Sequence, residues 1–396
     1  MKLRKTTKII ATLLVLLLVF SFAGCGGTSE PAETDNGDGN AADQADQLTF
    51  KLGVIAPFSG INAVRGEYIR KGVDYAVKEM AEMAGYENIS FDVIYEDTEG
   101  DASKATSAAE KLIQKDGVSG LIVSDSGPCL AVLPIATAAE IPMFVTAFSP
   151  DLTSQGSDYV FRCTVSDAIS GAGLAEYLVS QGYTKIGVAA ASSDYGQGAA
   201  KPFVAKLKEL GVDVVCNETF SETDVDFSAQ LINIKKADPE IILVHSYEAA
   251  ASAFTKQARE MGLDFEIVGI TGLASQQYMA AATPEFAEGV KALVAFMNTN
   301  QDPMVQEFVQ GFVAEYSDLP DHNVARAHAA ARIFGEAVKN AGSVGGADVA
   351  AAIHGIKDLK LPGGTFTFDE KGEGLGANSN SIGIWKDGKL EFLSTM

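Results

Sequence analysis

KLGVIAP at residues 51–57 and KIGVAAA at residues 185–191 are two similar stretches that decide the fold. Each is a short apolar run typical of a buried strand, and each is followed by a segment whose apolar residues recur at helical spacing. Strands and helices alternate after both, so the second run repeats the first after roughly 120–134 residues. Strand–helix units in series predict a parallel sheet covered on both faces. The sequence therefore predicts an α/β fold of two doubly wound parallel-sheet lobes with a cleft between them.

Local signals support individual elements of this fold. Asp101 precedes the helical segment at 102–116 and is a suitable N-cap, and Gly117 follows that segment as a stop signal. The Asp-Gly pair at 387–388 lies between two runs with strand character and predicts a hairpin turn. The chain from about 295 onward is too short for a third lobe, so we expect it to complete the first two.

The N-terminus has the features of an export signal. Basic residues precede an apolar run at 9–20 that is too short for a comfortable membrane span, and small residues then lead to Cys25. The ending Ala-Gly-Cys resembles a bacterial lipobox, although Phe22 stands where Leu is usual. We predict a lipoprotein signal peptide at 1–24 and a lipid anchor on Cys25. A plain signal peptide and an uncleaved anchor are the alternatives.

Composition limits the location and the partners of the protein. Residues 25–47 contain no large apolar side chain, which predicts a disordered, lipidated tether. The folded body would then be extracytoplasmic and held at the cell membrane. The formal net charge is −22, which argues against nucleic acid because its phosphates would be repelled.

The sequence carries no recognisable motif for catalysis, a cofactor or a metal. It lacks a GxGxxG after the first strand, and it has no GxxxxGK[ST], GxSxG or HExxH. Cys129, Cys163 and Cys216 lack metal-ligand spacing, and the four histidines lie apart. We therefore expect no metal and no cofactor. Two of the three cysteines could form an oxidised pair, which would leave at least one free, and buried free thiols are the favoured interpretation. A two-lobed cleft without catalytic groups favours a binding protein that is not an enzyme.

Four stretches carry a family resemblance. They are LGVIAPFSG, SDYGQGAAKPFVAKLKELGVDVV, DVDFSAQLINIKKADPEIILV, and AFTKQAREMGL leading into VGITGL. With these motifs the chain resembles the type I periplasmic solute-binding proteins of ABC importers, in the leucine/isoleucine/valine-binding group, over nearly all of 50–390.

The resemblance implies how the chain is organised and what it works with. It implies two lobes joined by a three-crossing hinge, a small solute enclosed by hinge closure, and delivery to ABC permease and ATPase subunits. We also expect a monomer. We assign residues 48–164 plus about 295–360 to the first lobe. Residues 165–294 plus about 361–396 are assigned to the second lobe.

Three turns are the expected binding regions. In open α/β sheets, ligands bind beyond the carboxyl ends of the strands, where helix N-termini offer unpaired N–H groups. SDSG at 124–127 and VTAFSPDLT at 145–153 occupy such places in the first lobe, and SSDYGQG at 192–198 occupies one in the second.

The resemblance assigns roles to four residues of the first lobe. Ser126 matches the serine that holds the carboxylate of an amino acid in the family. The backbone carbonyl of Ala147 matches the one that meets the ammonium group. The family's threonine hydroxyl falls at Phe148, or at Ser149 if the loop shifts by one residue.

Four further positions complete the implied ligand site. Tyr195 and Tyr247 match two aromatic residues of the second lobe. Thr271 stands where the family has the acid that pairs with the ammonium group, so that acid is missing. Arg65 occupies a first-lobe position that is often aromatic.

These departures leave two classes of solute open. The resemblance implies an amino acid-like solute of the branched-chain type. However, a buried ammonium without a carboxylate partner is costly, and the fork of Arg65 suits a carboxylate. With Phe148 adding apolar area, these features favour an alternative: an aromatic or aliphatic carboxylate, or an amide, that lacks an α-amine. Three other interpretations stay open: Asp125 or Glu248 replaces the missing acid, Arg65 faces solvent, or Phe148 turns into the lobe core.

Two other function classes are also considered. A ligand-sensing receptor ectodomain has the same fold but would need a cytoplasmic module or a second membrane span. A secreted α/β enzyme would need a nucleophile or metal constellation in the cleft, and Ser126 has no evident histidine partner.

Overall fold

The computed structural model describes residues 47–377 and 381–396, which belong to a single compact unit. The predicted signal peptide, the Cys25 anchor and nearly all of the predicted tether lie outside the described residues. Within the described ranges, none of the helices combines the length and the apolarity needed to cross a membrane.

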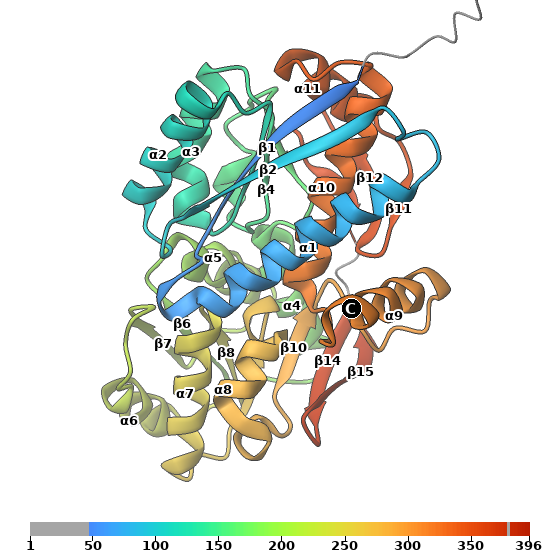
Figure 1. Ribbon diagram of the computed structural model, residues 1–396. Coiled ribbons are helices and arrows are strands. Elements are labelled where there is room, and N and C mark those ends of the chain that lie inside the picture. The colour runs from blue at the N-terminus through green and yellow to red at the C-terminus, as the bar shows by residue number, and fades with distance from the viewer. Residues whose placement is uncertain (1–46, 378–380) are drawn as a thin grey trace, which may run out of the picture. The chain divides into compact units, whose positions relative to one another are not determined.

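The first lobe is built on a five-stranded parallel sheet with the order β2-β1-β3-β4-β5. Its strands are β1 (Leu48–Ala56), β2 (Ile89–Asp97), β3 (Gly120–Val123), β4 (Met143–Val145) and β5 (Val160–Arg162). Its main helices are α1 (Ala63–Glu82), α2 (Ala102–Lys111), α3 (Ser126–Ala138) and α10 (His322–Ala341). Helices α2 and α3 bury apolar side chains on one face, and α1 and α10 cover the other (Figure 1). This lobe therefore has the predicted doubly wound form.

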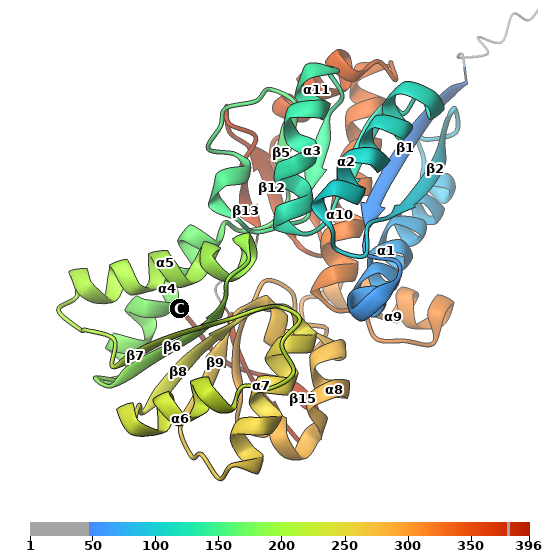
Figure 2. The ribbon, with the colours of Figure 1, turned by 90° about the vertical axis from the view of Figure 1, so that its left-hand side faces the viewer.

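The second lobe is built on a seven-stranded sheet with the order β15-β14-β10-β9-β8-β6-β7. Its strands are β6 (Ile186–Ala191), β7 (Cys216–Phe220), β8 (Ile241–His245), β9 (Glu266–Gly269), β10 (Lys291–Val294), β14 (Ser381–Lys386) and β15 (Lys389–Thr395). Its helices are α4 (Asp167–Ser180), α5 (Asp194–Glu209), α6 (Ser228–Ala237), α7 (Glu248–Glu260) and α8 (Gln276–Ala287). Helices α4 and α5 pack on one face, and α6, α7 and α8 on the other (Figure 2).

The two sheets confirm the internal repeat. The parallel strands β7-β6-β8-β9-β10 follow the same order as β2-β1-β3-β4-β5. Gly53 and Gly187, the glycines of the two quoted stretches, occupy equivalent places in β1 and β6. A Cβ atom at Gly53 would lie 2.8 Å from the side chain of Leu121, and one at Gly187 would lie 2.8 Å from Cys216 Sγ. The shared glycine therefore makes room for a side chain of a neighbouring element in both lobes.

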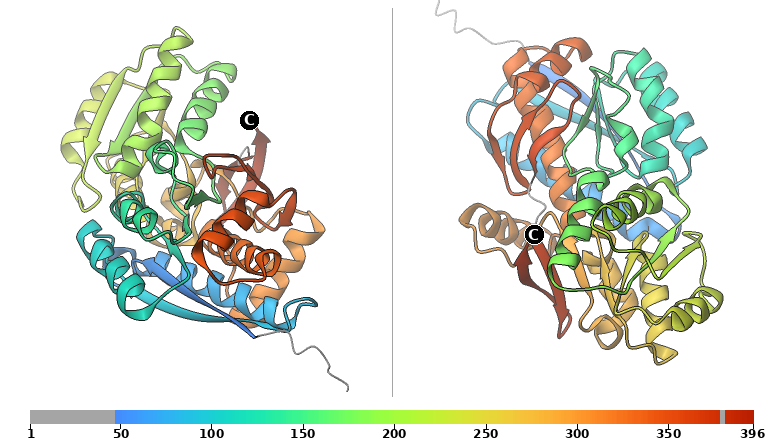
Figure 3. Two further views of the ribbon diagram at one scale, coloured as in Figure 1. Left: turned by 90° about the horizontal axis from the view of Figure 1, so that it is seen from above. Right: turned by 180° about the vertical axis from the view of Figure 1, so that it is seen from behind.

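The C-terminal region divides between the lobes at a different place from the one we expected. Strands β11 (Leu359–Leu361), β12 (Gly364–Phe368) and β13 (Gly374–Ala377) form a small antiparallel sheet, with α11 (Gly346–Gly355) before it. Leu361, Phe366 and Phe368 are buried in the core that contains β1, α1 and α10. Our assignment of residues from about 361 onward to the second lobe is therefore wrong for β12 and β13. Only the C-terminal hairpin, β14 and β15, joins the second sheet (Figure 3, darkest red).

The remaining helical segments also belong to these lobes. Helix α9 (Pro303–Tyr316) packs through Phe308 and Phe312 against Tyr75 of α1. Short turns of 3-10 helix lie at Gly60–Asn62, Pro150–Leu152 and Thr271–Ala274, and a π-helical turn follows α2 at Leu112–Asp116.

The local signals in the sequence are confirmed. The Asp101 side chain accepts a hydrogen bond from the Lys104 amide at 2.9 Å and caps α2. Gly117 has a φ of 68° and ends the π-helical turn. Asp387 and Gly388 have φ values of 48° and 73°, as a type I′ hairpin turn requires.

Candidate ligand-binding site

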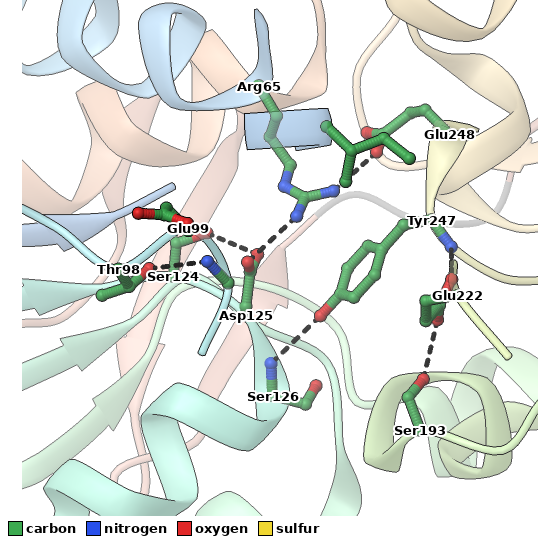
Figure 4. Close-up of polar contacts among 12 residues, drawn as sticks. Arg65, Thr98, Glu99, Ser124, Asp125, Ser126, Ser193, Glu222, Tyr247 and Glu248 are labelled. Atoms are coloured by element: carbon green, nitrogen blue, oxygen red, sulfur yellow. Dashed lines mark hydrogen bonds and ion pairs between the residues drawn. The ribbon is translucent and has the colours of Figure 1, made fainter. Parts of the chain in front are cut away.

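The candidate site lies where turns at the carboxyl ends of both sheets meet. The turn after β3 carries Asp125 and Ser126 at the start of α3, and the turn after β8 carries Tyr247 and Glu248 at the start of α7. The Ser126 amide donates a hydrogen bond to the Tyr247 hydroxyl at 3.3 Å, which joins the two lobes (Figure 4). This is the strand edge at which open α/β sheets bind ligands.

Arg65 bridges the two lobes by ion pairs. Its Nη2 lies 2.9 Å from Asp125 Oδ2 in the first lobe, and its Nη1 lies 2.6 Å from Glu248 Oε2 in the second (Figure 4). All three side chains are buried. Burial alone would lower the pKa of Arg65, but the charges of Asp125 and Glu248 raise it above the ordinary arginine value. The interpretation in which Arg65 faces solvent is therefore wrong, and its fork already holds two carboxylates of the protein.

Aromatic side chains form a wall beside this ion-pair cluster. The rings of Tyr195 and Tyr247 stack at 4.5 Å with an interplanar angle of 16°. The Tyr195 hydroxyl lies 3.2 Å from Thr271 Oγ1, and its ring centroid lies 6.0 Å from that of Phe148. Burial raises the pKa of both tyrosines, so both hydroxyls stay protonated at neutral pH. The guanidinium of Arg65 lies 4.1 Å from the centroid of the Tyr247 ring, which adds a cation–π contact.

The polar groups that would receive an amino acid by analogy already have protein partners. The Ala147 carbonyl accepts hydrogen bonds from Thr164 Oγ1 at 2.9 Å and from Arg162 Nη1 at 3.4 Å. The Ser126 hydroxyl accepts one from the Ser149 amide at 3.3 Å. A carbonyl oxygen has two lone pairs, so Ala147 has no acceptor capacity left for an ammonium group in this arrangement.

A small cavity of about 20 Å³ lies next to this wall, between the two lobes and α10. In this arrangement it has room for about one water molecule, so a larger solute requires the lobes to part. Twelve residues line it: Phe148, Cys163, Thr164, Thr271, Ala295, Phe296, His322, Ala325, Arg326, Ala329, Gly363 and Phe366. Phe148 lines this cavity and belongs to none of the core clusters within the lobes, so it is a wall of the cavity.

The structure brings the eight predicted ligand-binding residues into one connected cluster. Arg65, Tyr247, Ser126 and Ser149 are linked in that order by the contacts given above, and Tyr195 connects Tyr247 to Thr271 and Phe148. Ala147 precedes Phe148 in the same loop. A wider and more open groove over α1, α8 and α9 contains none of these eight residues.

Sequence reasoning missed two polar residues of the cavity, Arg326 and His322. Both are buried in the first turns of α10. A signal for Arg326 was present in the sequence, because Ala330, Ile333 and Ala337 follow it at helical spacing and place it on an apolar face. A buried arginine on such a face indicates either a salt bridge or a ligand site.

Comparisons with known proteins add a family and a set of relatives. A family profile described as periplasmic binding protein matches residues 49–383. The chain is similar to Leu/Ile/Val-binding protein homolog 3 of Brucella melitensis, at 27% identity over 344 residues, which cover 86% of this chain and 92% of that protein. It is also similar to a leucine-, isoleucine-, valine-, threonine- and alanine-binding protein of Pseudomonas aeruginosa, at 25% identity over 330 residues, covering 82% and 87%.

Two solved structures resemble the fold closely. A leucine-binding protein, LivK, of Thermotoga maritima superposes with a TM-score of 0.81 at 25% identity, covering 88% of this chain and 98% of that one. The second is LivJ of Streptococcus pneumoniae, a branched-chain amino acid transporter substrate-binding protein solved in complex with isoleucine. Its TM-score is 0.79 at 27% identity, and the match covers 87% of this chain and 99% of that one.

Proposed function

Because this chain belongs to the periplasmic binding protein family, we propose that it is the extracytoplasmic substrate-binding component of an ABC importer. It captures a small amino acid-like solute of the branched-chain type between its two lobes and delivers it to a permease. The observation that carries this proposal is the convergence of strand ends from both sheets on one cluster, in which Arg65 ion-pairs with both lobes. Relatives named for binding leucine, isoleucine and valine support the class of solute.

A second class of solute has its own support. Thr271 occupies the position of the family's acid, and the Ala147 carbonyl already accepts two hydrogen bonds. Asp125 and Glu248, the candidate replacements for that acid, are both paired with Arg65. A carboxylate or amide without an α-amine is therefore the alternative solute that these residues also suit.

The proposal includes an anchor and partners. Cys25 carries the lipid that holds the chain at the outer face of the cell membrane, and the permease and its ATPase subunits receive the solute from a monomeric carrier. The lipobox-like ending at Cys25 and the family membership support these parts. Of the eight clustered residues, Phe148 and Thr271 line the cavity and contact the solute, and none of the eight acts as a catalyst.

Two measurements test the carrier function. Isothermal titration of the purified chain from residue 26, which keeps the compact unit, should show binding of a branched-chain amino acid or a related small carboxylate without turnover. Deletion of the gene in its host should abolish uptake of the same radiolabelled solute. Uptake that is unchanged after deletion would instead support the sensing-receptor class, and conversion of the solute by the pure protein would support an enzyme.

A further inference from the structure

Arg326 is a buried cation without a carboxylate partner. Its side chain lines the small cavity between the lobes, and the residue is only 8% exposed. Its Nη2 donates a hydrogen bond to Asn323 Oδ1 at 2.6 Å, and its Nε has no partner. Among the described residues, no carboxylate lies within ion-pair distance of it. The buried Arg65 and Arg162, by contrast, each lie about 3 Å from an acid.

An unpaired arginine in such a place is costly to the protein. Burial and the nearby positive charge of Arg65 lower the pKa of Arg326, yet a guanidinium stays protonated in proteins. The nearby acids already have other partners. Asp125 and Glu248 form ion pairs with Arg65, and Asp321 accepts hydrogen bonds from backbone amides at the start of α10. An anion entering the cavity would therefore gain a partner that the protein itself does not satisfy.

The side chains that line the cavity have the chemistry to receive the body of a small acid once the lobes part to admit it. Phe148, Phe296 and Phe366 supply aromatic walls, and the Arg326 guanidinium lies 5.1 Å from the centroid of the Phe148 ring. Thr164 and Thr271 add hydroxyl groups. His322 has an unpartnered Nδ1, and burial holds its pKa well below the ordinary histidine value, so it stays neutral and offers a hydrogen bond.

We propose that Arg326 binds the carboxylate of the transported solute, and that the solute is a small monocarboxylate with an apolar body and no α-amine. In the part of the chain that the structure describes, the lining of the cavity contains no Asp or Glu that would receive an ammonium group, and Arg326 would repel one. This inference rests on the proposed carrier function and chooses between its two classes of solute. It assigns the carboxylate to Arg326 of α10, whereas the fork of Arg65 pairs with acids of both lobes.

The test separates the two charged groups of leucine. Isothermal titration at neutral pH compares leucine with 4-methylpentanoate, which lacks the amine, with leucinamide, which lacks the carboxylate, and with benzoate as a rigid acid. We expect 4-methylpentanoate or benzoate to bind at least about tenfold more tightly than leucine, and leucinamide not to bind. Arg326→Gln should weaken acid binding roughly 10- to 100-fold, and Arg326→Lys should weaken it less.

Two further variants keep the test independent of misfolding. Thr271→Glu adds a carboxylate to the same cavity and should weaken binding of the acids while strengthening binding of leucine. Arg332→Gln removes a cation that lies six residues further along α10, is paired with Glu79 and does not line the cavity, so it should leave acid binding unchanged. Circular dichroism and thermal melts report whether each variant is folded.

Each outcome decides the inference. Acid binding that depends on Arg326 supports it. Leucine binding that exceeds acid binding and is unchanged in Arg326→Gln overturns it but leaves the carrier function intact. Failure of the wild-type protein to bind any of the four compounds overturns the inference together with the proposed class of solute.

Discussion

Arg65 joins the two lobes at a position where we expected it to contact the ligand. The sequence alone places a cation near the strand ends, and its fork suits a carboxylate. In the structure, the two Nη atoms of that guanidinium pair with the carboxylates of Asp125 and Glu248. The sequence cannot reveal this, because Glu248 lies 183 residues away and pairs with Arg65 only once the lobes come together.

Asp321 should make stability depend on pH. Its carboxylate caps α10 by accepting hydrogen bonds from the Asn323 and Val324 amides, but burial raises its pKa to about 6. The native state therefore binds this proton more tightly than the unfolded chain does. The resulting stabilisation is present below the unfolded pKa near 3.8 and is lost as the pH rises through about 6.

The variant Asp321→Asn keeps a capping side chain and removes the charge. Its free energy of unfolding relative to wild type should therefore increase between pH 4 and pH 7, by up to about 3 kcal/mol. Urea denaturation at one-unit pH intervals measures this difference. A difference that stays constant across the range would contradict the assignment of the raised pKa to Asp321.

The sequence predicts residues of the candidate site only where they lie in turns at the carboxyl ends of strands. The turns carrying Ser126, Phe148 and Tyr195 were located correctly, because parallel strands bring their carboxyl ends to one edge. Arg326 was missed because it comes from a helix far along the chain. Helical spacing indicates that its side chain is buried, but no pattern in the sequence indicates which cavity it faces.

At the scale of elements, the repeat predicted most of the fold. Matching strand–helix units predicted two doubly wound parallel sheets, and the structure adds that both sheets have the same strand order. The assignment of strands β12 and β13 to the second lobe is wrong for a physical reason. The alternation in GTFTF shows that one face is buried, but it does not show which core receives that face. In the structure, Phe366 and Phe368 pack in the core of the first lobe, where Phe368 contacts Phe144 and Phe161.

The contact between α1 and α10 should be sensitive to a single methyl group. These helices carry Arg65 and Arg326, and they approach closely at Gly72. A Cβ atom at Gly72 would lie 2.5 Å from the Val324 carbonyl oxygen and 3.0 Å from Ala327 Cβ. Gly72→Ala must therefore push the helices apart, and we expect it to lower the free energy of unfolding by about 1–3 kcal/mol.

Gly355→Ala is the matched control for Gly72→Ala. Gly355 is also helical, and no atom lies within 4 Å of the position of an added Cβ, so its substitution should be neutral or slightly stabilising. Urea midpoints of the two variants give the comparison. If both variants were equally stable, α1 and α10 could move apart without lowering the free energy of unfolding. That result would contradict the close packing of the two helices at Gly72.

At the scale of the whole molecule, the contacts between lobes predict how closure is controlled. In the described residues, the lobes are joined at the candidate site by the Arg65–Glu248 ion pair and by the hydrogen bond from the Ser126 amide to Tyr247. Removing Glu248 leaves the buried Arg65 paired with Asp125 alone, and the loss of a buried ion pair costs several kcal/mol. This cost falls on the closed arrangement alone, because in an open arrangement both side chains regain water.

Glu248→Ala should therefore shift the equilibrium toward open lobes. If it costs about 3 kcal/mol, the ratio of closed to open molecules falls about 100-fold. Small-angle X-ray scattering of the chain from residue 26 should then give a larger radius of gyration for the variant than for wild type. Glu260→Ala removes an exposed acid at the other end of α7 and should leave the scattering unchanged. Superimposable curves for Glu248→Ala and wild type would show that this ion pair does not hold the lobes together, and closure would then depend on the solute itself.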